Sequence, residues 1–127
     1  MSDAILEHVN VTVSNPEKTA KMLCELFCWH IRWQGAAKNN GHTIHVGGTH
    51  SYVAVYGTKT PDGHADKTSN KVGSLNHIGV VVDNLEEIER RVKKAGFSPY
   101  NHGDYEPGRR FYFDDHDDIE IEVVSYQ

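Results

Sequence analysis

The chain has few cysteines, and they are not spaced for a cross-link. Cys24 and Cys28 are the two cysteines. Four residues apart on an expected helix, they share a face but are poorly placed for a disulfide, which needs a specific approach of the two Cβ atoms. We therefore expect two small core side chains and no disulfide framework.

Positive charge is scarce, and no long apolar run occurs. The 13 lysine and arginine residues are outnumbered by 18 acidic residues, so the formal net charge is -5. The absence of a basic stripe argues against nucleic acid as a partner. No apolar window approaches the length of a membrane helix, and the first residues lack the basic and apolar regions of a signal peptide. We expect a cytoplasmic protein with no membrane partner.

Length and histidine content give the first positive indications. A chain of 127 residues fits one compact domain, or two small half-domains fused into one, and is long enough for a real core. It contains nine histidines, which makes metal binding worth considering, although most surface histidines bind no metal.

A strand and a helix open the chain. Residues 6–13 alternate apolar and polar side chains, which predicts a strand with His8 on its polar side. Residues 14–17, Ser-Asn-Pro-Glu, supply a cap candidate and a proline for the first turn of a helix that should end near Cys28. Three further strands are predicted at residues 31–34, 42–46 and 51–56.

The same pattern then begins again. Residues 75–84 match residues 6–15 at an offset of 69 (77 − 8), and this register pairs His77 with His8. A second helix is predicted over residues 85–95 with Gly96 as its stop, followed by three strands. The chain is therefore one βαβββ unit written twice. Module one is residues 1–57, the linker is residues 58–73, and module two is residues 74–127.

The last two predicted strands form a hairpin with one apolar and one polar face. Period-2 alternation puts one set of side chains towards the helix: Phe111, Phe113, Ile119, Ile121 and Val123. The opposite face carries Arg110, Tyr112, Glu120 and Glu122. A carboxylate on an inward face is costly to bury without a partner, so we expect a cation opposite Glu122.

These patterns predict an α+β fold in a single domain, residues 1–127. Two tandem βαβββ modules would form a curved, cup-shaped mixed sheet with the helices on its outer face. The polar-side residues would line the hollow. That set is His8, Asn10, Thr12, Thr43, His45, Tyr52, Tyr56, His77, Arg110, Tyr112, Glu120 and Glu122.

Three of these residues match a metal site. His8 and His77 occupy equivalent positions of the repeat, and Glu122 lies on the same side near the end of the last strand. Two imidazoles and one carboxylate are a facial ligand set that leaves positions open for water and substrate. The alternative is that both histidines are satisfied polar residues and that Glu122 pairs with Arg110.

The repeat and the closing motif resemble the vicinal oxygen chelate superfamily, which contains glyoxalase I, fosfomycin-resistance thiol transferases, extradiol dioxygenases and bleomycin-resistance proteins. The family closes with Phe-x-Asp-Pro-Asp-Gly-Asn-x-Ile-Glu-Leu. Here Asp115, Asp117, Ile121 and Glu122 match, while His116 and Asp118 replace the usual proline and glycine. The resemblance covers nearly the whole chain.

The resemblance implies a divalent metal ion on His8, His77 and Glu122, without distinguishing Zn, Ni, Mn, Fe or Co. Glyoxalase I-type members use a fourth ligand, a glutamate at the end of module one. The offset of 68 after the helix (122 − 54) places Ala54 there, so that ligand is missing. Three-ligand members, the dioxygenases and the fosfomycin thiol transferases, fit the ligand count better.

Residues around the predicted metal are given roles by their chemistry. Arg110 and Tyr112 are candidates for binding an anionic group of the substrate. Tyr52, Tyr56 and His45 are candidates for acid, base or oxyanion donor, and Glu120 for a replacement base. The alternatives are structural: lining residues for the first three, and a solvated rim carboxylate for Glu120.

Two functions remain open. The first is a metal-dependent enzyme that chelates vicinal oxygens of a small substrate and stabilises an oxyanion, with a lyase or isomerase as default and thiol transfer or ring cleavage as variants. The second is a metal-free protein of the bleomycin-resistance type that sequesters a drug. Small members of the superfamily commonly pair as homodimers that share the site between chains, and we expect the same here.

Overall fold

The computed structural model describes residues 1–63 and 68–127. Residues 64–67, which belong to the predicted linker, lie outside the described residues. The chain divides into two compact units, Met1–Asp62 and Gly63–Gln127. Their boundary falls within the predicted linker, and each unit is described by itself.

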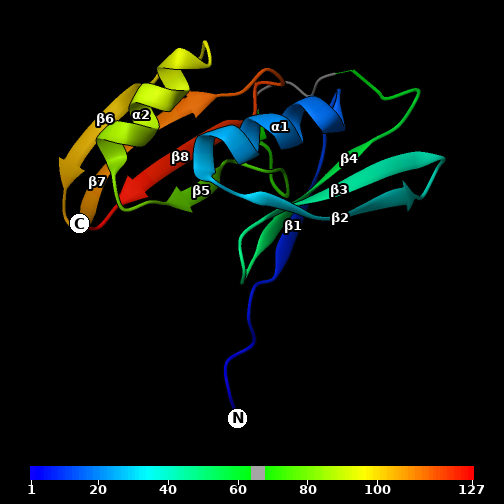
Figure 1. Ribbon diagram of the computed structural model, residues 1–127, viewed down its shortest axis with the longest axis horizontal. Helices are drawn as coiled ribbons and strands as arrows, with labels where there is room; N and C mark the ends of the chain where they lie inside the picture. The colour runs from blue at the N-terminus through cyan, green and yellow to red at the C-terminus, as the bar shows by residue number, and fades with distance from the viewer. Residues whose placement is uncertain (64–67) are drawn as a thin grey trace. The chain divides into compact units, whose positions relative to one another are not determined.

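Unit one is a four-stranded mixed sheet with one helix on it (Figure 1). Its strand order is β1-β4-β3-β2, in which β1 and β4 run parallel and the other pairs antiparallel. Helix α1 packs on β2, β3 and β4. The elements are β1 (His8–Thr12), α1 (Pro16–Phe27), β2 (His30–Ala37), β3 (Gly41–Gly47) and β4 (Tyr52–Gly57).

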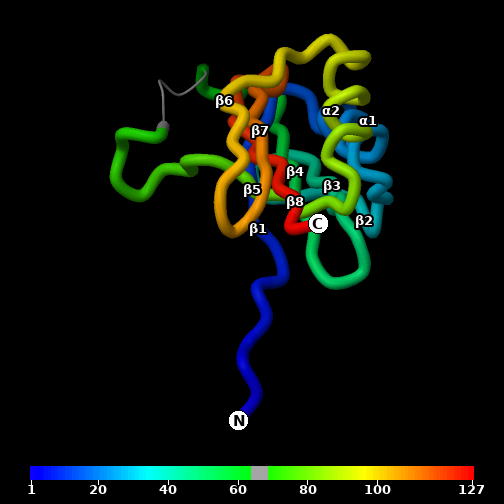
Figure 2. Tube along the Cα trace, turned by 90° about the vertical axis from the view of Figure 1, so that its left-hand side faces the viewer, coloured from blue at the N-terminus to red at the C-terminus, as the bar shows by residue number. Residues whose placement is uncertain are grey.

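Unit two repeats this topology. Its strand order is β5-β8-β7-β6, again with the first pair parallel and the others antiparallel. The tube in Figure 2 follows the same strand, helix and three-strand path in this unit. The elements are a 3-10 turn η1 (Thr68–Asn70), β5 (Ile78–Val81), α2 (Leu85–Lys94), β6 (Tyr100–Tyr105), β7 (Gly108–Asp114) and β8 (Glu120–Ser125). The predicted α+β class and the βαβββ repeat are confirmed.

Both helices begin with the same cap. Asn15 and Asn84, equivalent in the repeat, each accept a hydrogen bond of 3.1 Å on the side chain, from the backbone N–H of Lys18 and of Glu87 respectively. This satisfies a helix donor that would otherwise lack a partner. Helix α1 ends at Cys28, whose φ of 58° is left-handed. Gly96, with φ of 96°, follows α2 as predicted.

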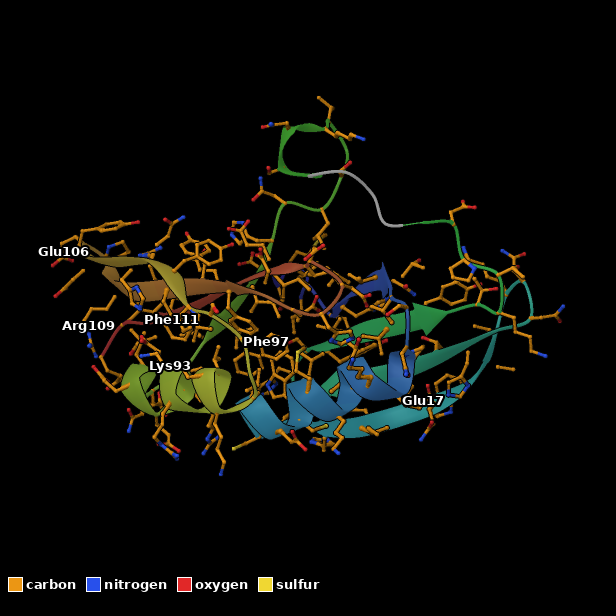
Figure 3. All side chains as sticks on the ribbon, turned by 90° about the horizontal axis from the view of Figure 1, so that it is seen from above. Glu17, Lys93, Phe97, Glu106, Arg109 and Phe111 are labelled. Carbon is orange, nitrogen blue, oxygen red and sulfur yellow. The ribbon has the colours of Figure 1, made fainter. Side chains whose placement is uncertain are left out.

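Alternation along the strands builds each core. In unit two Phe111, Phe113, Ile121 and Val123 are buried, and Figure 3 shows Phe111 between β7 and α2. In unit one Ile44, Val46, Val53 and Val55 form the helix-facing set, and all four are buried. The burial of these eight residues agrees with the predicted alternation on β3, β4, β7 and β8.

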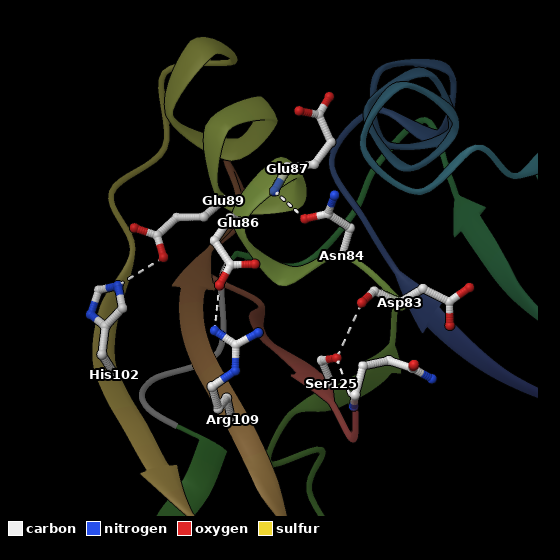
Figure 4. A network of polar contacts seen from close by, with 9 residues as sticks. Asp83, Asn84, Glu86, Glu87, Glu89, His102, Arg109 and Ser125 are labelled. Carbon is white, nitrogen blue, oxygen red and sulfur yellow. Dashed lines mark hydrogen bonds and ion pairs between the residues drawn. The ribbon is translucent and has the colours of Figure 1, made fainter.

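Polar contacts attach α2 to its sheet (Figure 4). Glu89 lies 3.1 Å from the Nε2 of His102 on β6, and Glu86 accepts a hydrogen bond from Arg109 on β7. On the adjacent strand β8, where Ser125 pairs with Arg109, the Ser125 hydroxyl donates to the Asp83 carbonyl at 3.4 Å. These contacts hold the helix against β6 and β7, on the face opposite Glu122.

Some sequence expectations differ from the structure. Cys28 is exposed and Cys24 only partly buried, so the expectation of two core side chains is wrong, while neither cysteine forms a disulfide. Val9, on the edge strand β1, and Leu6, which precedes β1, are both exposed. Among the described residues, no helix is long and apolar enough to cross a membrane.

Candidate functional site

Glu122 is the centre of the polar face of unit two. It lies on β8, where its Cα neighbours across the sheet are Tyr112 on β7 and Gly79 on β5. Its Oε2 accepts a hydrogen bond of 2.9 Å from Nη1 of Arg110, and its Oε1 lies 3.0 Å from Nε2 of His77. Glu122 thus pairs with Arg110, as in the alternative to a metal site, and the predicted ligand His77 contacts the same carboxylate.

The ring of His77 is oriented by its neighbour. Its Nδ1 lies 2.7 Å from the side-chain oxygen of Asn76, whose amide nitrogen in turn donates to the Ser69 carbonyl at 3.5 Å. The contact of Nδ1 with Asn76 fixes the ring so that Nε2 is directed at Glu122. Such outer contacts are what orient metal-binding histidines in proteins.

Unit one holds its histidine in the same way. The Nδ1 of His8 lies 2.9 Å from Oε1 of Glu7, the residue equivalent to Asn76 in the repeat. Glu7 also accepts a hydrogen bond of 3.3 Å from the Tyr52 hydroxyl. The His8 hydrogen bond is the main reason that the pKa of Glu7 lies below its usual value. Both repeat histidines thus have Nδ1 occupied by the preceding side chain, which leaves Nε2 for another partner.

The position equivalent to Glu122 carries no ligand in unit one. Ala54 is the third residue of β4 as Glu122 is of β8, and it is buried. Its Cα neighbours are His45 on β3 and Asn10 on β1. The imidazole of His45 therefore stands beside the position where a glyoxalase I-type glutamate would lie.

His45 and Tyr52 lie together on this face. Their rings stack with centroids 4.5 Å apart. Burial lowers the pKa of His45, and the charges of His8 and Arg32 act in the same direction. Burial raises the pKa of the Tyr52 hydroxyl, and Glu7 adds to this. The shifts favour a neutral imidazole, which can accept a proton, beside a phenol that keeps its own.

Tyr56 has a structural contact. Its hydroxyl donates to the Lys38 carbonyl at 2.7 Å, which ties β4 to the turn between β2 and β3. Its ring lies over Gly41, where a Cβ would come within 2.5 Å of the ring. This contact occupies the hydroxyl that the sequence offered as a catalytic candidate.

Glu120 and Tyr112 lie on the polar face of unit two as predicted. The Tyr100 hydroxyl contacts two carboxylates, at 2.7 Å from Asp114 and 3.2 Å from Glu120. Tyr112 stacks on Tyr100 and presents its ring to the edge of His77, with centroids 6.1 Å and 6.0 Å apart. Burial, and then the charge of Glu122, raise the pKa of Tyr112.

Two nitrogen atoms of the Arg110 guanidinium donate no hydrogen bond to the described residues. Its Nε and Nη2 are buried and have no hydrogen-bond partner among the described residues. Tyr105 covers the guanidinium, with the ring centroid 4.8 Å from Cζ. A planar guanidinium with unused donors suits an anionic group.

The predicted ligands are distributed over both units. His77 and Glu122 meet in unit two, while His8 belongs to unit one. Within residues 1–63 and 68–127, no group of three or more His, Cys, Asp and Glu side chains that could hold a metal ion is found. The pair in unit two would supply one imidazole nitrogen and one carboxylate oxygen to an ion, and both are ligand types that divalent metals accept.

Sequence reasoning missed several side chains that shape the site. Glu7 and Asn76 orient the two histidines, and their signal was available in the repeat, where each directly precedes its histidine. Tyr105 and Trp33 gave no such signal, because their positions depend on a turn and on a bulge.

The fold is one of two βαβββ modules. His8 opens the first strand of unit one, His77 directly precedes the first strand of unit two, and Glu122 lies on the last strand. A family model identifies the class of protein to which this arrangement belongs. The chain belongs to the Glyoxalase/Bleomycin resistance protein/Dioxygenase superfamily, whose model matches residues 5–123.

Solved structures share the fold at low sequence identity. A glyoxylase/bleomycin resistance protein/dioxygenase domain from Frankia sp. EAN1pec has a TM-score of 0.83 and 19% identity, covering 99% of this chain and 100% of that one. A glyoxalase family protein from Bacillus cereus has a TM-score of 0.78 and 15% identity, covering 98% and 95%.

A third similar structure is the fosfomycin resistance protein FosX from Listeria monocytogenes, complexed with Mn(II) and sulfate. Its TM-score is 0.70 and its identity 16%, covering 98% of this chain and 93% of that one. No curated protein matches the chain. At these identities the structural similarities establish the fold alone.

Proposed function

We propose that this protein is a divalent-metal-dependent enzyme in which His8, His77 and Glu122 hold the ion. The observation that supports this most is the contact of 3.0 Å between Nε2 of His77 and Oε1 of Glu122. When bound, the ion would draw two vicinal oxygens of a small substrate together and polarise them. Zn, Ni, Mn, Fe and Co all suit this ligand set.

The outer contacts of the ligands support the same proposal. Glu7 and Asn76 each contact Nδ1 of the histidine that follows them, which leaves Nε2 of His8 and of His77 as the nitrogen that would bind an ion. Arg110 holds the second oxygen of Glu122 and leaves Oε1 for another contact. Side chains fixed in this way need little rearrangement to bind an ion.

The remaining residues suit a proton transfer at an anionic substrate. His45, kept neutral by burial, accepts the proton, and Tyr52 orients it through ring stacking. Arg110 and Tyr112, beside Glu122 on the same face, receive an anionic group of the substrate. Glu120 is held by Tyr100 and serves as a rim carboxylate rather than as the base.

A lyase or isomerase reaction is the default within this proposal. Ala54 leaves the fourth ligand position without a carboxylate, which argues against the proton transfer of a four-ligand glyoxalase and favours three-ligand chemistry. Thiol transfer and ring-cleaving oxygenation are the three-ligand variants. FosX, similar in fold, is described with Mn(II), which supports divalent metal use in this fold.

The site would be shared between two chains. His8 of one copy would meet the partner's His77 and Glu122, since small members of the superfamily commonly pair in this way. Analytical ultracentrifugation combined with an activity assay tests this. A fully active monomer would contradict it.

A reaction screen tests the enzyme proposal. Metal-loaded protein would be assayed with methylglyoxal plus thiol, with fosfomycin, and with catechols, beside the Glu122→Gln variant. We expect turnover of one class, lowered at least about a hundredfold in the variant. The His50→Ala variant, an exposed loop histidine, serves as the control and should retain full activity.

A second candidate is a metal-free binding protein of the bleomycin-resistance type. The observation that favours it is that Arg110 and His77 together satisfy both oxygens of Glu122 without an ion. The two candidates differ in their response to a chelator. Tight drug binding that persists in EDTA and in the Glu122→Gln variant supports sequestration, whereas turnover that EDTA abolishes supports the enzyme.

A further inference from the structure

The two predicted histidine ligands have chemically different neighbours. Glu7 and Asn76 occupy equivalent positions of the repeat, at the offset of 69 (76 − 7), and each directly precedes a histidine. Each side chain contacts Nδ1 of that histidine, at 2.9 Å from His8 and at 2.7 Å from His77. The contact is therefore repeated in both units, but a carboxylate makes it in unit one and an amide makes it in unit two.

These two groups restrict the proton of the imidazole differently. An ionised carboxylate only accepts hydrogen bonds, so its contact with His8 needs a proton on Nδ1, and in a neutral imidazole this leaves the lone pair on Nε2. An asparagine side chain can turn either its oxygen or its NH2 group towards a ring nitrogen. Asn76 is therefore compatible with a proton on either nitrogen of His77, whereas Glu7 fixes the tautomer of His8.

Tyr52 on β4 holds Glu7 and His8 in this arrangement. Its hydroxyl donates to Oε1 of Glu7 at 3.3 Å, the same oxygen that contacts His8. Its backbone N–H donates to the Glu7 carbonyl at 3.0 Å, and its ring stacks on the His8 ring with centroids 4.8 Å apart. The Glu7 side chain is 61% exposed, so these contacts are what restrict its rotamers.

Unit two has a different residue at the position of Tyr52. The offset of 68 (120 − 52) places Glu120 there, and an ionised carboxylate has no proton to donate to a neighbouring side chain. Glu120 accepts a hydrogen bond from the Tyr100 hydroxyl at 3.2 Å, while the amide nitrogen of Asn76 donates to the Ser69 carbonyl at 3.5 Å. The combination of a carboxylate and a phenol behind the histidine is thus present in unit one and not at the equivalent positions of unit two.

We infer that Glu7, held by Tyr52, is a positioning residue that keeps His8 in the tautomer whose Nε2 can bind an ion. A carboxylate on the outer nitrogen of a metal-binding imidazole also raises the basicity of the ligand. A neutral amide does this less, so the metal site should depend more on Glu7 than on Asn76. The inference rests on the proposed function in taking His8 as a ligand, but the tautomer itself is a property of the metal-free protein.

The tautomer is tested by NMR of nitrogen-15-labelled, EDTA-treated protein at about pH 8.5, well above the range in which free histidine titrates. Long-range correlations of the imidazole nitrogens show which nitrogen carries the proton, and the His8 signals are those missing from His8→Ala. We expect the Nδ1–H form in the wild type and in Asn76→Leu. Glu7→Leu should convert His8 largely to the Nε2–H form that free histidine favours. An Nε2–H form in the wild type, or the same tautomer in Glu7→Leu, would overturn the inference.

Metal affinity gives a second readout, measured as competition for Zn(II) with a chromophoric chelator. Glu7→Gln keeps an acceptor at this position without the charge and should weaken Zn(II) binding about tenfold. The matched pair is Glu7→Leu and Asn76→Leu, the same change at equivalent positions, and we expect the larger loss in Glu7→Leu. Equal losses in the matched pair, or wild-type affinity in Glu7→Gln, would overturn the inference.

Tyr52→Phe tests the residue that holds Glu7. It removes the hydroxyl and keeps the stacked ring, so it should weaken Zn(II) binding less than Glu7→Gln and leave part of His8 in the Nε2–H form. No change in either measurement would contradict the role given to Tyr52. Unfolding curves of each variant establish that it is folded.

The inference and the proposed function fail in different ways. Absence of Zn(II) binding by the wild type would contradict the proposed function, while the tautomer of His8 in the metal-free protein would still decide the role of Glu7. Zn(II) binding of equal strength in the wild type and in both Glu7 variants would leave the proposed function standing and overturn the inference.

Discussion

Oε1 of Glu122 lies 3.0 Å from Nε2 of His77, while Oε2 of the same carboxylate lies 2.9 Å from Nη1 of Arg110. Glu122 thus joins an imidazole and a guanidinium, one through each oxygen. Asn76 contacts Nδ1 of the same imidazole and fixes the orientation of the ring. The direct contact between His77 and Glu122 suits a binding protein, whereas an ion held by both groups would make the protein a metalloenzyme.

The contact between Arg110 and Glu122 should contribute to stability. Both side chains are mostly buried, at 14% and 13% exposed. Arg110→Gln should lower the free energy of unfolding by about 1–3 kcal/mol, because a hydrogen bond between charged groups is lost in a partly buried place. Arg109→Gln is the matched control, since its partner Glu86 is 68% exposed and the cost should stay below about 1 kcal/mol.

A double-mutant cycle isolates the contact between Arg110 and Glu122 from the other effects of each substitution. Urea unfolding of Arg110→Gln, Glu122→Gln and the double variant gives the coupling between the two side chains. We expect the double variant to be more stable than the sum of the single effects predicts. Additive effects would mean that the Arg110–Glu122 contact has no net influence on folding.

Asp115 should stabilise the turn between β7 and β8. Its buried carboxylate accepts hydrogen bonds from the backbone N–H groups of Asp117 and Ile119, at 2.8 Å and 3.0 Å. Asp115→Ala should cost about 1–3 kcal/mol, because both donors lose their acceptor. Asp115→Asn retains an acceptor oxygen and should cost less. Thermal unfolding measures both, and equal losses would contradict the role of the acceptor.

Asp118 occupies a position where the superfamily motif has glycine. Its φ of 60° is left-handed, a conformation that glycine adopts without a Cβ penalty. We expect Asp118→Gly to be neutral or stabilising by up to about 1 kcal/mol, and Asp118→Val to be clearly destabilising. Chemical denaturation checks the order of the three proteins. A marked loss in the glycine variant would show that the Asp118 side chain matters more than its backbone.

Glu87 should make stability depend on pH in acid. The Arg90 hydrogen bond, followed by that of Arg91, lowers the pKa of this carboxyl to about 2 from 4.5. A lowered carboxyl pKa gives stability that is fully present above about pH 4.5 and is lost as the pH falls towards 2. Unfolding midpoints between pH 2 and 6 should fall less steeply in Glu87→Gln than in the wild type, with Arg90→Gln between them. Identical slopes in all three would contradict this.

Much of the fold could be read from residue patterns, because the determinants are local. Asn15 and Asn84 cap their helices by accepting a hydrogen bond from a backbone N–H three residues later. Alternation along β7 assigned Phe111 and Phe113 to the buried face and Tyr112 to the opposite face. The repeat placed His8 and His77 at equivalent positions, at the start of β1 and directly before β5, and the alternation along the last strand placed Glu122 on the polar face. Alternation does not distinguish an edge strand from a central one, and Val9, an apolar position of the edge strand β1, is exposed.

The rest of the site depends on contacts that the periodicity of apolar residues in the sequence does not predict. The register shift between Ile31 and Trp33 turns Trp33 to the face of the sheet opposite α1, contrary to simple alternation. The roles of Asn76 and Tyr105 follow from side-chain rotamers and from the turn between β6 and β7. Arg110 was predicted as both a partner of Glu122 and an anion ligand. The first is observed within unit two, and the second stays a prediction.

The most direct test of the proposed metal centre is its metal content. Protein stripped with EDTA and reloaded with Mn(II) or Zn(II) would be passed over a desalting column and analysed by mass spectrometry for ions per chain. We expect about one ion per chain in the wild type and in the His50→Ala control. In His8→Ala, His77→Ala and Glu122→Gln, affinity should fall at least about tenfold. Metal content in His77→Ala equal to that of the wild type would contradict the account.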